Sequence, residues 1–124
     1  MTKTFQDIIA WQKAHIFVLS VYKYCKTFPP EEKYGLWSQF TRAAVSIAAN
    51  IAEGYKKISK LDKIRFFNIS QGSLEECRYY IILSKDLGYI TLDQYNDLKQ
   101  KLDNASVYLN TYINAIINNK VITD

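Results

Sequence analysis

The chain has 124 residues, the length of one compact domain, so we expect a single domain over residues 1–124. Its composition, 48% hydrophobic and 23% charged with a net charge of +4, argues against disorder, and four glycines and two prolines are too few for the turns of a β-sandwich. One histidine and two cysteines leave few ligands for a zinc site, so we expect no metal and no cofactor.

The beginning of the chain shows no apolar secretory segment followed by small residues. The longest apolar runs, such as residues 16–19, are far too short to span a bilayer. We therefore expect a cytoplasmic protein that does not use a membrane, with Cys25 and Cys77 as reduced thiols in the core.

The first half of the chain predicts helices over residues 6–27 and 30–53. Prolines at 29 and 30 followed by Glu31 and Glu32 are typical of a first helical turn, where acids face the positive end of the helix dipole. Gly54 stands where a left-handed cap would end the second helix.

The second half predicts helices over residues 60–87 and 92–118. Ser59 with Asp62, and Thr91 with Gln94, have the spacing of capping boxes. Gly88 lies between these two helices and supplies the stop signal of the first.

Three of the four segments carry one seam of side chains at alternating steps of three and four residues, the spacing of a helix that faces a partner. The seams are Ile8, Trp11, His15, Val18, Tyr22 and Cys25 in the first helix, Phe67, Ser70, Leu74, Cys77, Ile81 and Ser84 in the third, and Tyr95, Leu98, Leu102, Ala105, Leu109, Tyr112 and Ile116 in the fourth. Long helices with short loops predict an all-α fold, an antiparallel up-down-up-down four-helix bundle.

The second helix has two largely apolar registers instead of one. They are Leu36, Phe40, Ala43, Ile47 and Asn50, and Trp37, Phe40, Ala44, Ile47 and Ile51. One interpretation is a second contact with another copy of the chain. The other is that this helix lies deepest in the bundle and touches both neighbours.

The sequence contains no arrangement typical of an enzyme, because it lacks a phosphate loop and a partner for its single histidine. We expect His15 to be a structural residue of the core seam. We also expect Gly72 and Ser73 to mark a close approach of two helices. Polar residues near the apolar faces form either a hydrogen-bonded network, which we favour, or a ligand pocket.

Positive charge is concentrated in residues 33–66, with seven basic and two acidic residues. The candidate nucleic-acid ligands are Lys56, Lys57, Lys60, Lys63 and Arg65, aided by Arg42 or Arg78 if they are exposed. Tyr55, Phe66 and Phe67 lie among them, a mixture suited to phosphates and bases. The alternative is an ordinary solvated lysine-rich loop.

Several segments closely resemble the small bacterial proteins encoded in intervening sequences of 23S ribosomal RNA genes. The most specific is RAAVSIAANIAEG at residues 42–54, and the others are FPPEEKYGL at 28–36, GSLEE at 72–76, WQKA at 11–14 and LGYI at 87–90. The matching motif positions are Arg42, Ser46, Asn50, Glu53, Gly54, Ser73 and Glu76. Ser70 and Cys77 depart from the Ala and Leu expected in relatives.

The resemblance implies a cytosolic four-helix bundle that forms a homo-oligomer, since a pentameric ring occurs among relatives. It brings no catalytic residues. The similar accessory proteins of diversity-generating retroelements are thought to bind nucleic acid and a reverse transcriptase. We therefore expect a non-enzymatic pentamer that binds RNA or DNA, or else an interaction or scaffold module that binds a protein and no nucleic acid.

Overall fold

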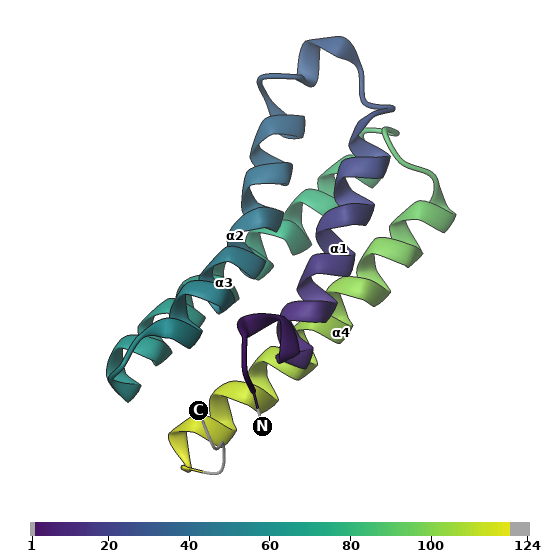
Figure 1. Cartoon of the computed structure of the whole chain (residues 1–124). Coiled ribbons are helices and arrows are strands. Elements are labelled where there is room, and N and C mark those ends of the chain that lie inside the picture. Colours follow the sequence, from purple (N-terminus) through teal and green to yellow (C-terminus); the bar gives the residue numbers. More distant parts are fainter. Residues whose placement is uncertain (1, 120–124) are drawn as a thin grey trace.

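The computed structural model describes residues 2–119, and four helices carry its architecture (Figure 1). They are α1 (Ile9–Cys25), α2 (Leu36–Lys56), α3 (Lys60–Asp86) and α4 (Leu92–Ile117), with 3-10 turns η1 (Phe5–Asp7) and η2 (Pro30–Glu32) before α1 and α2. The helices run alternately up and down, and each packs against two others. The described residues thus form the predicted all-α antiparallel bundle.

The ends of α3 and α4 agree with the sequence prediction because local signals determine them. The Ser59 hydroxyl accepts the Asp62 backbone N–H at 3.1 Å. Thr91 and Gln94 form a complete capping box, with bonds of 3.1 and 2.9 Å. Gly88 has a φ of +77°, the left-handed conformation that favours glycine after a helix.

The ends of α1 and α2 correct the prediction. The segment predicted as one helix over residues 6–27 is turn η1, an extended residue at Ile8, and then α1. The segment 30–53 begins with η2, and α2 starts only at Leu36, whose N–H donates to Glu32 Oε1 at 3.0 Å. Gly54 lies inside α2, which continues to Lys56.

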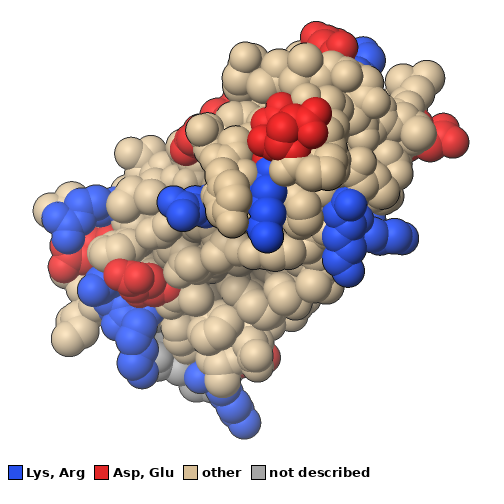
Figure 2. Space-filling model, turned by 90° about the horizontal axis from the view of Figure 1, so that it is seen from above, with Lys and Arg blue, Asp and Glu red and all other residues tan. Residues whose placement is uncertain are grey.

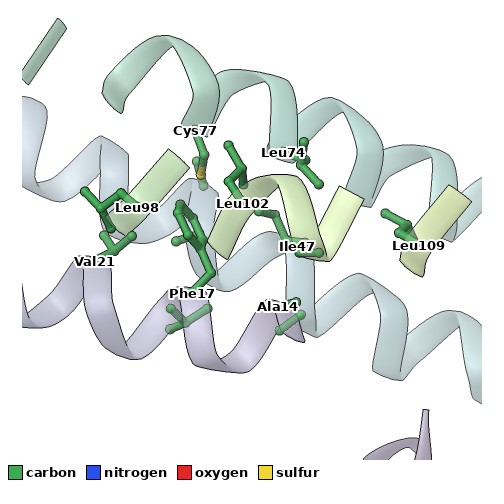
Figure 3. Packing of buried hydrophobic residues seen from close by; sticks show 14 of the residues in the cluster. Ala14, Phe17, Val21, Ile47, Leu74, Cys77, Leu98, Leu102 and Leu109 are labelled. Carbon is green, nitrogen blue, oxygen red and sulfur yellow. The ribbon is translucent and has the colours of Figure 1, made fainter. Parts of the chain in front are cut away.

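Side chains from all four helices meet in one hydrophobic core, part of which is drawn in Figure 3. The α3 seam is buried throughout, and in α4 five of the seven predicted residues are buried and both tyrosines are half-buried. Cys25 and Cys77 are free and buried, as expected, and burial raises the pKa of Cys25 to about 12.

The seam predicted for α1 is only partly correct: Ile8, Val18 and Cys25 are buried and Trp11 is half-buried, but His15 and Tyr22 are not in the core. His15 is exposed and stacks on Trp11 with ring centroids 5.0 Å apart, and Tyr22 is 47% exposed. The core side of α1 is formed by Cys25 and Val18 from the predicted seam together with Ala10, Ala14, Phe17 and Val21, which the prediction missed. Because α1 has large apolar side chains on its outer side as well as its inner side, its sequence spacing is compatible with several orientations.

Helix α2 packs against both α1 and α3, and most extensively on α3. Leu36, Phe40 and Ile47 are buried together with Ala43, Ala44 and Ile51, so side chains from both of its apolar registers are covered within one chain. The wide apolar surface of α2 is therefore explained by its deep position in the bundle. Self-association would use a surface other than this covered side of α2.

Candidate nucleic-acid interface

The end of α2 and the beginning of α3 bring four basic residues together at one corner of the bundle. Lys56 and Lys60 are exposed, Lys57 is half-exposed, and the Arg65 side chain is 69% exposed. We call these four residues together with Phe66 the basic corner. It is built by a turn of three residues, in which the Ser59 cap fixes the direction of α3.

Lys63, the remaining candidate, is buried and does not belong to this surface. Its ammonium group donates to the backbone oxygen of Tyr55 and lies 5.5 Å from the centroid of the Tyr55 ring. Burial lowers the pKa of Lys63. Lys63 therefore joins the first turn of α3 to the last turn of α2 and cannot reach a phosphate without leaving that place.

The ring of Phe66 organises two of the corner's cations. Lys57 Nζ lies 4.8 Å and Arg65 Cζ 5.8 Å from its centroid, within the range of cation–π attraction. Arg65 also pairs with Asp62 at 3.4 Å. Lys60 Nζ donates to the Ile117 backbone oxygen at 3.1 Å, near the end of α4. Phe67, which the sequence grouped with Phe66, is fully buried.

Gly54 sets the distance between the two helices at this corner. A Cβ atom at position 54 would lie 2.6 Å from Phe67 Cε1 and 3.0 Å from Phe66 Cβ. The motif glycine is therefore required by close packing of α3 on α2, and not by a helix cap as the sequence indicated.

The polar motif residues meet along the α2–α3 contact. The Ser73 hydroxyl donates to Ser46 Oγ at 2.7 Å, and Asn50 Nδ2 donates to the same atom at 3.0 Å. Arg42, Ser46, Ser73 and Glu76 line a shallow groove of about 270 Å³ with Gln39 and Tyr80. The structure thus contains both a hydrogen-bonded network and a groove along this contact. Glu53 belongs to neither of them.

The hydroxyl of Tyr80 makes a second, separate set of hydrogen bonds in the same groove, although Tyr80 is not among the candidates predicted from the sequence. It donates to Gln39 Oε1 at 3.1 Å and lies 3.3 Å from Glu76 Oε2. Burial, followed by the Glu76 charge, raises the pKa of Tyr80. Its position four residues after Glu76, on the same helix face, was the available signal.

Two further expectations about exposed residues are resolved by the structure. Arg42 is exposed, whereas Arg78 lies between Asp103, at 2.7 Å, and Glu75, at 3.4 Å. Gly72 is exposed, and a Cβ atom added there would meet nothing within 4 Å, so this glycine marks no close approach within the chain.

A second groove lies beside the basic corner, between the first residues of the chain and the end of α2. It encloses about 620 Å³ and is lined by Lys3, Thr4, Phe5, Ala49, Ala52, Glu53, Tyr55 and Lys56. We call it the N-terminal groove. The sequence pattern does not reveal it, because η1 reaches α2 only through the folding of the chain.

Charge on the molecule is mixed outside the corner. On the face seen from above in Figure 2, basic and acidic side chains lie among each other and broad areas are uncharged. Within residues 2–119, no group of three or more His, Cys, Asp or Glu side chains is placed to hold a metal ion. None of the helices in the same region has the length and hydropathy needed to cross a membrane.

A family model described as 23S rRNA-intervening sequence protein matches residues 6–111. The chain belongs to this family. A solved relative is a protein of unknown function from the S23 ribosomal protein family of Bacteroides thetaiotaomicron VPI-5482, with 26% identity and a TM-score of 0.79 over 86% of this chain and 96% of that one. No curated protein matches. Neither the family nor this relative indicates an enzymatic activity, and both agree with the helical fold.

Proposed function

We propose that this protein is a non-enzymatic, self-associating helical bundle that binds RNA or DNA through the basic corner. The observation that carries the proposal is the gathering of Lys56, Lys57, Lys60 and Arg65 at the turn between α2 and α3, where two of them, Lys57 and Arg65, lie against the half-exposed ring of Phe66. Cations of this kind contact phosphates, and an aromatic ring beside them offers a stacking surface for a base.

Self-association would make this modest patch effective. A single corner has few cations, and Asp62 pairs with one of them. Several copies in one assembly would present several corners to the same nucleic acid, which raises the effective concentration of each contact. The resemblance to pentameric relatives and the exposed apolar residues on the outer side of α1 both support an assembly.

A salt series with fluorescently labelled RNA tests the proposal. A fragment of 23S rRNA is the first probe, because the family is named for it. Replacing Lys56, Lys57 and Lys60 by Gln should weaken binding and flatten the dependence of log K on log salt by about 0.7 to 0.9 for each phosphate that is no longer neutralised. Lys63 is left unchanged because it is buried.

The matched control removes three positive charges elsewhere. Lys23, Lys26 and Lys99 are exposed and lie outside the corner, so replacing them by Gln changes the net charge equally. This control should retain most of the salt dependence. If the unaltered protein does not bind RNA or DNA at low salt, or if both triple variants lose the same slope, the basic corner is not a nucleic-acid site.

The second candidate is a protein-interaction or scaffold module without nucleic-acid binding. It is favoured by four exposed apolar side chains on α1, which are Ile9, Ile16, Leu19 and Tyr22. This candidate predicts an association that resists nuclease and high salt and is lost when these side chains are made polar. Absence of binding to nucleic acid at low salt would leave it as the better proposal.

A further inference from the structure

The N-terminal groove has the size, the walls and the charges to hold a single unpaired nucleobase. Its volume of about 620 Å³ lies in the range of small-molecule sites. Ala49 is exposed and Ala52 half-exposed along one side, so the helix offers a flat apolar surface without a bulky side chain. The rings of Phe5 and Tyr55 also line the groove.

Both aromatic rings are held in place by contacts within the chain. Phe5 packs edge-on against Trp11, with ring centroids 5.1 Å apart. The Tyr55 hydroxyl donates to the Thr2 backbone oxygen at 3.3 Å, and Lys63 Nζ lies 5.5 Å from the Tyr55 ring centroid. A ligand entering the groove would therefore meet walls that are already ordered, which lowers the entropy cost of binding.

The charges of the groove suit a nucleotide better than a purely apolar ligand. Lys3 and Lys56 contribute two ammonium groups to its lining, and Glu53 contributes a carboxylate. Within residues 2–119 none of these three side chains makes an ion pair. The two cations can meet the phosphates on either side of a nucleotide, while the carboxylate accepts hydrogen bonds from the edge of its base.

The groove is continuous with the basic corner through the last turns of α2. Lys56 belongs to both, and Gly54 packs on Phe66 while its neighbours Glu53 and Tyr55 line the groove. A nucleic-acid strand whose backbone follows the corner would thus bring its next bases to the groove.

We propose that the N-terminal groove binds one unpaired base of a single-stranded nucleic acid, between Phe5, Tyr55 and the alanine surface of α2. The inference rests on the proposed nucleic-acid function and adds the class of substrate, because the bases of an intact duplex cannot enter. Guanine offers two adjacent donors to the Glu53 carboxylate, whereas uracil offers one donor between two acceptors. The groove therefore prefers guanine to uracil.

Fluorescence anisotropy with three heptanucleotides tests the proposal: uridines with one central guanosine, uridines alone, and the same strand with a central abasic site. The guanosine strand should bind about tenfold more tightly than the abasic strand, the effect of one stacked base. Ala52→Leu should remove that advantage by filling the groove. The deoxyribose versions of the strands show whether RNA or DNA is preferred, and the same pattern in either series supports the proposal.

Three further variants separate the groove from general effects. Ala49→Leu fills the groove from an exposed position, so it serves if Ala52→Leu fails to fold. Ala115→Leu is the matched control, because Ala115 is also half-exposed but lines a different pocket, beside Tyr108 and Tyr112. Glu53→Gln should reduce the preference for guanosine over uridine while salt dependence is retained.

The outcomes distinguish this inference from the function on which it rests. If no strand binds at low salt, the proposed nucleic-acid function fails. A second outcome would be binding whose salt dependence requires Lys57 and Lys60, with the abasic strand binding as tightly as the guanosine strand and no effect of Ala52→Leu. In that case the basic corner is a nucleic-acid site and the N-terminal groove is not. Duplex binding equal to single-strand binding would also overturn the inference.

Discussion

Two glycines inside helices have opposite surroundings, and each is a test of local packing. At Gly54 an added Cβ atom would lie 2.6 Å from the ring of Phe67, which is fully buried. At Gly72 an added Cβ atom would meet nothing within 4 Å. The same substitution should therefore have opposite effects at the two positions.

Gly54→Ala should destabilise the fold by about 1–2 kcal/mol, because overpacking against Phe67 exceeds the gain in helix propensity. Gly72→Ala should stabilise it by about 0.5–1 kcal/mol, since an exposed helical glycine is less favourable than alanine. Urea denaturation of both variants and of the unaltered protein measures these changes in the free energy of unfolding. A stabilising Gly54→Ala would show that α3 can move away from α2 at little cost, and the role assigned to Gly54 would be wrong.

The contact between α1 and α4 contains a polar cluster that links stability to pH. The Tyr24 hydroxyl donates to Asp97 Oδ2 at 2.6 Å, and Lys101 Nζ bonds Asp97 at 3.0 Å and Ser20 Oγ at 2.7 Å. The hydrogen bond from Tyr24, aided by Lys101, lowers the pKa of Asp97, and the same bond raises the pKa of Tyr24 to about 12.

Asp97→Asn should reduce the free energy of unfolding at pH 7 by about 1 kcal/mol, the value of a typical charge-assisted contact at a partly exposed site. Because the folded pKa of Asp97 is lowered, its contribution is complete above the ordinary aspartate pKa, near pH 4, and is lost as the pH falls through the folded value. The difference between the unaltered protein and the variant should therefore shrink below about pH 4.

Urea denaturation at a series of pH values measures this difference. Tyr24→Phe removes the same hydrogen bond from the other helix and provides the matched variant. The double variant should lose less unfolding free energy than the two single variants lose in sum, because each single variant already removes the one shared interaction. If the unaltered protein and Asp97→Asn differed in unfolding free energy by the same amount at pH 7 and at pH 3, the role assigned to the Asp97 carboxylate would be wrong.

The sequence predicts helices α3 and α4 well and α1 poorly, for one physical reason. In α3 and α4 most of the exposed residues are charged or polar, although some apolar side chains such as Ile69 and Val107 are exposed too, so the predicted seam is the side with the most apolar residues. In α1, Ile16 and Leu19 on the outer side are as apolar as Phe17 and Val21 on the inner side. The orientation depends on packing in three dimensions, such as that of Phe17 against Phe40, with ring centroids 6.4 Å apart.

The candidate site was predictable only in its exposed parts. Charge and loop position predicted that Lys56, Lys57 and Lys60 lie together on the surface, and the structure places them so, because the end of one helix and the beginning of the next share one corner. They did not reveal that Lys63 is buried against Tyr55, since buried and exposed lysines look alike in a charge count. The N-terminal groove depends on residues about fifty positions apart, which periodicity cannot bring together.

At the scale of the whole molecule, the outer side of α1 carries apolar side chains that contacts within one chain do not cover. Ile9, Ile16, Leu19 and Tyr22 are 51%, 44%, 57% and 47% exposed on the side opposite Ala14 and Phe17. A helix that is apolar on both sides usually has a second partner. Because most side chains of both apolar registers of α2 are already covered within the chain, α1 is the face on which we expect other copies to associate.

Light scattering during size-exclusion chromatography should therefore give a mass that is a multiple of 14.4 kDa, and Leu19→Glu should reduce it to that of one chain. Val107→Glu on α4 is the matched control, because Val107 is 62% exposed but lies on another helix. The control should leave the mass unchanged. A single-chain mass for the unaltered protein would contradict self-association, and an unchanged mass for Leu19→Glu would show that another face is used.

Since copies in one assembly act together on a nucleic acid, Leu19→Glu should also weaken RNA binding without removing a single positive charge.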